Sequence, residues 1–291
     1  MKKPTNTVAR KRRKRFCEYG PVCYQIALIK EYLVRDVKDL FSGERFAKTF
    51  AGTDLPCIVK GHRSLMLRNL HGVDMALQHN KVKNLAIAAS RMDGLLIRPG
   101  ETFSFWRLVG KVSRRQGYLT GMTIVNGRPQ SDTGGGLCQL ANLVHWLVLN
   151  SPLTVTELHH HTDALFPDSG RRVPFGTGTS VFYKNVDYRF RNDTDQTVQL
   201  RIWQEEDDLC GELRSERPFP NRYRIEEEGN CFVREGEDFF RISRVYKHTI
   251  DRETGQTVSR ELILNNHSRV LYDHSLIPPE QIKTIEEAYV D

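Results

Sequence analysis

Long apolar runs are missing from the sequence, and so is a signal for secretion. A membrane-spanning helix needs roughly 18 or more predominantly apolar residues, and no stretch of the chain approaches that length. The first 30 residues have neither the apolar region nor the small-residue cleavage site of a secretory signal peptide. We therefore expect the protein to stay in the cytoplasm.

Closely spaced cysteine pairs are also missing. A Cys-x-x-Cys pair is the usual mark of a structural zinc site, whereas scattered cysteines are typical of reduced thiols. The spacing favours reduced thiols over a disulfide framework or a structural zinc site, and we expect no bound cofactor. The six cysteines are Cys17, Cys23, Cys57, Cys138, Cys210 and Cys231.

Outside its first 43 residues the sequence has no net charge. The chain holds 43 Lys and Arg and 36 Asp and Glu, which gives a net charge of +7. Eleven of the basic and four of the acidic residues lie in residues 1–43, and the other 248 residues hold 32 of each sign. The basic character therefore belongs to an N-terminal arm that contains RKRRKR at residues 10–15.

An amphipathic helix that ends near Gly43 is predicted directly after this basic run. A basic run beside such a helix can bind an anionic membrane surface, here at its inner face and through residues 10–43, or the helix can pack on its own domain. No aromatic residues alternate with the arginines, so we expect no nucleic-acid partner. The apolar residues at helical spacing are Ile26, Ile29, Leu33, Val37, Leu40 and Phe41.

A second helix is predicted from residue 78 to a stop at Gly94, with Val82, Leu85, Ala86, Ala89 and Met92 on one face. A short buried strand, a Pro-Gly turn and an aromatic cluster of Phe103, Phe105 and Trp106 follow, and we expect these rings in the core. Further along, an Asn-Gly turn at residues 126–127 indicates a hairpin.

The stretch GGGLCQLANLVHWLVLN places Cys138 at the start of a third helix. The apolar stripe of this helix consists of Leu140, Leu143, Val144, Leu147 and Val148. Cys138 falls on a different face, which is small and polar and carries Ala141, Asn142 and His145. The helix start favours the thiolate, and N–H groups of the glycine loop could stabilise an oxyanion.

A histidine run, His159, His160 and His161, follows this helix. In an extended segment His159 and His161 point to the same side. Three interpretations remain open at this point: a structural role, a Cys–His acyl-transfer site, and a metal site. His145 is excluded as the base because seven helical residues place it about 10 Å along the axis from Cys138.

Several of these motifs together resemble the VanW family, over residues 60–205. They are NLAIAASRMDGLLI (84–97), RPGETFSFWRLVG (98–110), GGGLCQLANLVHW (134–146), the histidine segment and DYRFRNDT (187–194). The resemblance implies a bacterial protein of cell-wall peptide metabolism and glycopeptide (vancomycin) resistance, with an L,D-transpeptidase-like cysteine acyltransferase activity. The alternative is a non-catalytic accessory module that binds peptidoglycan stem peptides or precursors, or a membrane partner.

The resemblance implies roles for particular residues. Cys138 matches the family cysteine and becomes the nucleophile, His161 is the preferred base, and His159 is the second choice. The residues expected at the substrate or oxyanion are Gly134, Gly135, Gly136, Gln139 and Asn142.

The chain departs from the family pattern at one position. Many members carry an aspartate in a G-x-D-A-T stretch, where this chain has GTGTSV with Gly178. If that aspartate orients the histidine, Asp163 or Asp187 must substitute for it.

The elements together predict an α+β fold of twisted antiparallel and mixed strands with two or three packed helices. We expect a basic arm and amphipathic helix at residues 1–60 and a VanW-like core at residues 61–205. A β-rich C-terminal extension is expected at residues 206–291, because alternating segments there are separated by glycines.

Overall fold

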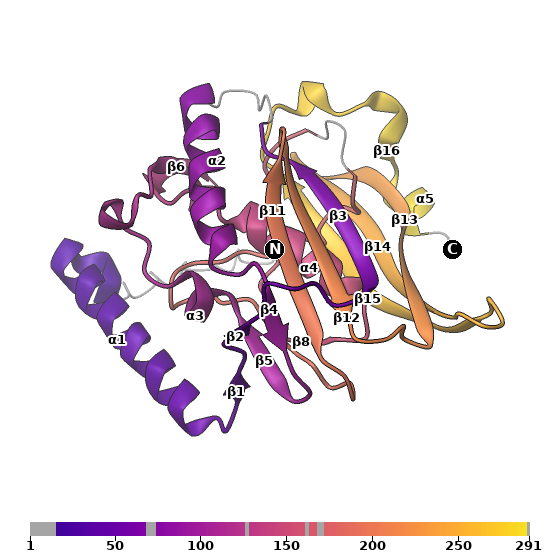
Figure 1. The fold of residues 1–291 in the computed structure, drawn as a ribbon. Coiled ribbons are helices and arrows are strands. Elements are labelled where there is room, and N and C mark those ends of the chain that lie inside the picture. Colours follow the sequence, from indigo (N-terminus) through magenta and orange to yellow (C-terminus); the bar gives the residue numbers. More distant parts are fainter. Residues whose placement is uncertain (1–15, 68–73, 126–127, 161–162, 168–171, 290–291) are drawn as a thin grey trace, which may run out of the picture. The chain divides into compact units, whose positions relative to one another are not determined.

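The computed structural model describes residues 16–67, 74–125, 128–160, 163–167 and 172–289. It has two compact units, of which the first ends at Gly43 and the second begins at Glu44. The first unit contains a short 3-10 helix, η1 (Phe16–Tyr19), and the long helix α1 (Pro21–Phe41), shown in indigo in Figure 1. The helix predicted after the basic run is thereby confirmed.

Two small sheets and one hairpin form the strands of the core in the second unit. The five-stranded sheet is ordered β2 (Thr49–Phe50), β4 (Leu95–Ile97), β11 (Val198–Glu205), β12 (Asp208–Ser215) and β3 (Cys57–Leu65). The four-stranded sheet is ordered β1 (Arg45–Phe46), β5 (Glu101–Ser104), β10 (Arg189–Arg191) and β8 (Thr154–Glu157). The hairpin pairs β6 (Thr120–Val125) with β7 (Arg128–Thr133), as its Asn-Gly sequence predicts, although residues 126–127 lie outside the described residues.

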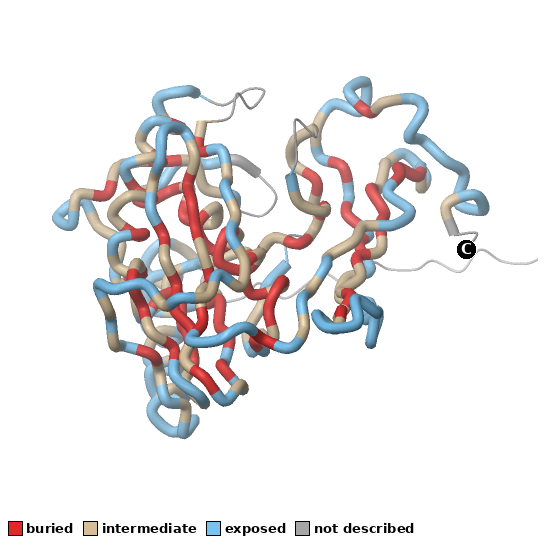
Figure 2. Tube along the Cα trace, turned by 45° about the vertical axis from the view of Figure 1, so that its right-hand side comes forward, coloured by how far each residue is buried: buried red, intermediate tan, exposed pale blue. Residues whose placement is uncertain are grey.

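Helices α2 (Met75–Ser90) and α4 (Cys138–Leu149) pack against the five-stranded sheet, α2 on β11 and α4 on β12 and β3. The close approach of α4 depends on Gly211, where a Cβ would lie 3.0 Å from Leu143 and 3.2 Å from Leu147. Both helices were predicted from their apolar spacing. Figure 2 shows the buried segments, in red, gathered inside the fold, with exposed segments following its outer turns.

The predicted aromatic cluster lies in the core, where β5 continues into the short helix α3 (Phe105–Val109). Phe103 and Phe105 are fully buried, and the ring of Phe103 stacks on Phe190 of β10 at a centroid distance of 4.7 Å. This packing confirms the interpretation of these rings as core.

The C-terminal region is an antiparallel meander, as predicted from its alternation. Its long strands are β13 (Asn221–Glu235), β14 (Asp238–Asp251) and β15 (Thr257–Val270), with short β9 (Asp163–Ala164) and β16 (Ile282–Lys283) at the two edges. The remaining short helices are η2 (Arg114–Gln116), η3 (His274–Leu276), η4 (Pro279–Gln281) and α5 (Ile285–Tyr289).

The expected boundary between residues 205 and 206 falls within the turn that joins β11 to β12. These two strands pair along their whole length, and β12 also pairs with β3. Strand pairing thus makes residues 208–215 part of the core sheet. The α+β class itself, with antiparallel and mixed sheets and a β-rich C-terminal region, is confirmed.

Candidate functional site

Cys138 is the first residue of α4 and follows the turn formed by Gly134, Gly135 and Gly136, as the sequence predicts. The five residues of the predicted apolar stripe are all buried. The start of the helix, its end and its sheet-facing side therefore agree with the prediction.

The opposite face of α4 is buried as well, which the sequence interpretation did not anticipate. Ala141 and His145 are 0 % and 1 % exposed. The cover is a segment from residue 177 to 188, since the backbone N–H of Thr179 donates to the Asn142 Oδ1 at 2.7 Å and the Tyr188 hydroxyl lies 3.0 Å from His145 Nδ1. Helix α4 is therefore enclosed between a sheet and this segment.

The enclosure changes the expected chemistry of Cys138. Its side chain is half-buried and its Sγ lies 4.0 Å from the Val181 carbonyl oxygen of the covering segment. Burial raises the pKa of the Cys138 thiol, and this effect outweighs the backbone hydrogen bonds that favour the thiolate. The expectation that the helix start favours the thiolate is therefore not met, because burial of the thiol shifts its pKa in the opposite direction.

The glycine loop is required by packing. A Cβ at Gly135 would collide with the backbone of Gly121 in β6, and one at Gly136 would collide with the side chain of Lys81 in α2. Gly136 also has a φ of +97°, a conformation that residues with a Cβ rarely adopt. Without side chains at these glycines, the loop before α4 can pack closely against the backbone of β6 and the side chain of Lys81 in α2.

Asn84 of α2 anchors the same loop, and the sequence analysis missed it. It is fully buried; its Nδ2 donates to the carbonyls of Leu119 and Gly135 at 3.0 Å each, and its Oδ1 accepts from the Leu119 N–H at 2.8 Å. By helical spacing Asn84 falls opposite the predicted apolar face, so the sequence pattern gave no signal for its burial.

The N–H groups proposed for the oxyanion are engaged in the fold. Gly134 N–H donates to the Leu119 carbonyl at 2.8 Å, and Gly135 N–H donates to the Asp132 carbonyl at 3.2 Å. Their role toward a substrate stays a prediction.

The two polar residues expected at the substrate also hold the fold together. Gln139 Nε2 donates to Ser64 Oγ at 2.9 Å and to the Leu65 carbonyl at 2.8 Å, which ties α4 to the end of β3. Asn142 Oδ1 receives the N–H of Thr179 from the covering segment. Each amide thus positions an element that surrounds Cys138.

His159 contacts the covering segment one residue before Val181, the residue that contacts Cys138. Its carbonyl accepts from the Ser180 N–H at 2.7 Å, and Ser180 precedes Val181, whose carbonyl is the neighbour of the Cys138 thiol. This contact is made by the His159 backbone, while its ring nitrogen Nε2 faces Glu157, so the role of His159 as a base stays a prediction. The first choice, His161, lies outside the described residues.

Glu157 is the carboxylate that orients His159. Its Oε1 lies 3.1 Å from His159 Nε2 and also accepts from the Asp187 N–H at 3.1 Å, while its Oε2 lies 3.5 Å from Arg189 Nε. The sequence analysis missed this residue. The signal was present, because Glu157 and His159 alternate in an extended segment and so share one side.

The carboxylates named as substitutes for the family aspartate have other partners. Asp187 is buried and accepts hydrogen bonds from Ser104 Oγ at 2.6 Å, the Trp106 N–H at 3.0 Å and Arg189 Nε at 2.8 Å. Asp163 lies in β9, opposite Arg269 of β15. Asp187 therefore joins β5, α3 and β10 through these hydrogen bonds.

Gly178, where the family aspartate is expected, lies beside α4. A Cβ at this position would be 3.2 Å from Asn142 Oδ1, and Asn142 is one helical turn from Cys138. The departure from the family pattern thus falls next to the candidate nucleophile.

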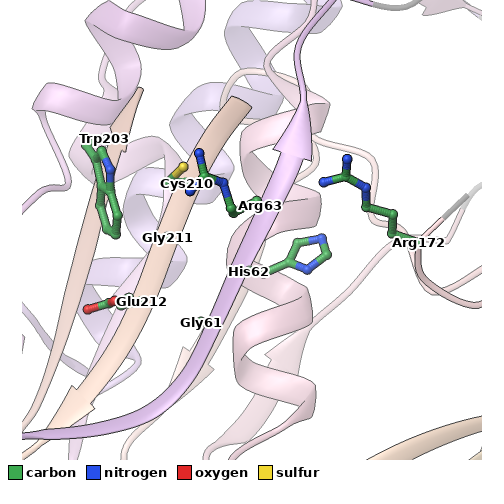
Figure 3. Close-up of a pocket in the computed structure, with 8 residues that line it drawn as sticks. All are labelled: Gly61, His62, Arg63, Arg172, Trp203, Cys210, Gly211 and Glu212. Atoms are coloured by element: carbon green, nitrogen blue, oxygen red, sulfur yellow. The ribbon is translucent and has the colours of Figure 1, made fainter. Parts of the chain in front are cut away.

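Two surface cavities lie away from Cys138, which is not among the residues that line them. The first, of about 450 Å³, opens over β3, β11 and β12 (Figure 3). Burial and the charge of Lys60 lower the pKa of its His62 to about 4. The second measures about 380 Å³ and is lined by Asn80, Lys83, Arg114, Gly117, Tyr118, Leu119 and Thr120.

Within the described ranges, no three His, Cys, Asp or Glu side chains converge as a metal site requires. In the same part of the chain no helix is both long and apolar enough to pass through a membrane.

Comparison with known proteins identifies the family. The VanW family profile, described as "VanW like protein", matches residues 80–214. The vancomycin B-type resistance protein VanW of Enterococcus faecalis is 32 % identical over 232 residues, which is 80 % of this chain and 84 % of that protein. The chain belongs to the VanW family.

A more distant relative is the uncharacterized protein YoaR of Bacillus subtilis, which is 30 % identical over 118 residues, or 40 % of this chain and 37 % of YoaR. No solved structure matches the chain.

Proposed function

We propose that the protein contributes to resistance against vancomycin-type glycopeptides as a cysteine acyltransferase that acts on D-amino-acid-containing cell-wall peptides. The relative that supports this role is the vancomycin B-type resistance protein, which covers most of the chain. The observation that supports the catalytic part is that the His159 backbone and the Cys138 thiol contact adjacent residues, Ser180 and Val181, while the His159 ring pairs with Glu157.

In the proposed reaction the Cys138 sulfur attacks a peptide carbonyl of the stem peptide. A histidine, His159 or His161, accepts the thiol proton and later gives it to the leaving amine. The C–N bond breaks, a thioester forms on Cys138, and a second amine or water then takes the acyl group and restores the thiol. Glu157 holds the imidazole of His159 in place for this transfer.

The raised pKa of the thiol sets a requirement for this mechanism. Because burial keeps Cys138 protonated, proton transfer to the histidine must accompany binding of the peptide. The covering segment at residues 177–188 is the element that would have to move, since its Val181 carbonyl occupies the space beside the sulfur.

Intact-mass spectrometry tests the proposal directly. The wild-type protein and Cys138→Ala are incubated with peptidoglycan stem peptides and with carbapenems as acyl donors. We expect one added acyl mass on the wild type and none on Cys138→Ala, while Cys57→Ala, which removes another half-buried thiol, keeps the adduct. Folded wild-type protein that takes up no acyl group from any donor would contradict catalysis.

A second candidate function is a module that binds the same peptides without turnover. Two observations favour it: the thiol is held protonated, and Gln139 and Asn142 serve the fold. This candidate predicts saturable binding of stem peptides, measured by calorimetry, that survives Cys138→Ser. Acylation of the wild type at Cys138 would contradict it.

A further inference from the structure

Helix α1 presents an uninterrupted apolar stripe to solvent. None of its 21 residues is buried. The six residues of the stripe are between 51 % and 77 % exposed, although residues of this kind are normally buried in a soluble protein. They are Val22, Ile26, Ile29, Leu33, Val37 and Leu40.

The stripe runs along one side of the helix from its first turn to its last. The spacing of three or four residues keeps successive members on the same face. Glu31, Arg35 and Lys38 fall on the other side of the same helix by the same rule. Ahead of it, Phe16 and Tyr19 in η1 are 55 % and 67 % exposed, and such rings favour the boundary between lipid and water.

The charge of the arm is concentrated just ahead of the stripe. All of the chain's net charge of +7 lies in residues 1–43. Within α1 the three basic residues are matched by three acidic ones, so the excess comes from the residues before the helix. An apolar face and a block of positive charge next to each other complement a surface with an apolar interior and anionic groups at its boundary.

We propose that α1 lies in the plane of an anionic lipid surface, with its apolar stripe at the acyl boundary and the preceding basic residues on the headgroups. The apolar stripe favours lipid over nucleic acid, because a phosphate backbone in water offers nothing for six exposed aliphatic side chains to bury against.

Vesicle flotation of the full chain tests this inference. The probes are vesicles of phosphatidylcholine alone and of phosphatidylcholine with phosphatidylglycerol. We expect the protein to float with the anionic vesicles at least about tenfold more strongly than with the neutral ones, and salt to weaken the binding. Equal flotation with both, or with neither, would overturn the proposal.

A pair of matched variants separates the stripe from the rest of the helix. Ile29→Ser combined with Leu33→Ser should reduce flotation about tenfold, since both residues belong to the stripe. Tyr24→Ser removes an exposed ring on the other side of α1 and should change little. If both variants float as the wild type does, the stripe is not the lipid-binding face.

The same variants also test whether protein or nucleic acid, instead of lipid, binds the stripe. A fall in the melting temperature of Ile29→Ser with Leu33→Ser without vesicles, or a change in its oligomeric state by light scattering, would show that protein covers the stripe and would overturn the proposal. Retention of the protein on duplex DNA without flotation would also overturn the proposal, and would indicate that the arm binds nucleic acid. An unchanged melting temperature and mass, together with lost flotation, supports lipid docking.

Discussion

The glycine loop before helix α4 and the face of α4 under the covering segment are held by different kinds of contact. On the glycine-loop side, Gly135 meets Gly121 backbone to backbone, and Asn84 fixes the loop with three hydrogen bonds. On the other side, polar side chains meet the segment from residue 177 to 188, with His145 on Tyr188 and Asn142 on Thr179. The glycine loop therefore builds the fold through backbone packing, whereas the polar contacts lie along the face of α4 that the covering segment buries.

The largest effect is expected on the glycine-loop side. Gly135→Ala places a Cβ against the backbone of Gly121, which cannot move as a flexible side chain would. We expect a loss of about 3 kcal/mol or more in the free energy of unfolding, measured by urea denaturation. Gly52→Ala, whose Cβ would meet nothing within 4 Å, is the matched control and should stay within about 0.5 kcal/mol of the wild type.

Asn84→Ala tests the anchor of the loop. The change leaves the Leu119 N–H and the Gly135 carbonyl without their side-chain partner, while the Leu119 carbonyl keeps the Gly134 N–H, and each unpartnered group costs free energy. The free energy of unfolding should fall by about 2–3 kcal/mol. Lys83→Ala, at an exposed position of the same helix, is expected to leave it nearly unchanged, and equal losses in both variants would argue against a specific anchor.

The regular helices and strands could be predicted from the sequence, whereas the burial of both faces of α4 could not. Apolar spacing predicts α2, α4 and the C-terminal meander, because each buries one periodic face. The segment that covers Cys138 has no such period and lies about 40 residues further along the chain, so its contact with α4 cannot be deduced from local pattern. Asn84 and Glu157 were missed for a related reason, since single polar residues gain their role only from the partner that the fold supplies.

A pH experiment probes the polar side through His145. Burial, followed by the charges of His160 and Lys247, lowers its pKa from 6.5 to about 3. Below pH 6.5 the unfolded chain therefore binds a proton at His145, whereas the folded protein stays unprotonated there until about pH 3. The free energy of unfolding therefore falls as the pH drops from 6.5 toward 3. Between pH 7 and pH 5 this amounts to at most about 2 kcal/mol.

Comparison with His145→Phe isolates that contribution. The difference in free energy of unfolding between wild type and variant should shift by up to about 2 kcal/mol against the wild type from pH 7 to pH 5. His79→Phe, at an exposed ring, is the control and should show no such shift. A difference for His145→Phe that is independent of pH would mean that the folded protein accepts the proton as readily as the unfolded chain does.

The smallest effect, and the one that bears on catalysis, is expected at Glu157. Glu157→Gln keeps an acceptor for the Asp187 N–H but removes the charge beside His159 Nε2. If His159 takes the proton of Cys138, the rate of acylation by a carbapenem, followed by mass spectrometry, should fall about tenfold, which equals about 1.4 kcal/mol. His160→Gln is the matched control, since this ring bonds the Gly176 carbonyl instead of a carboxylate. Acylation of both variants at the wild-type rate would remove His159 from the mechanism and favour His161, so the outcome decides between the two histidines proposed as the base.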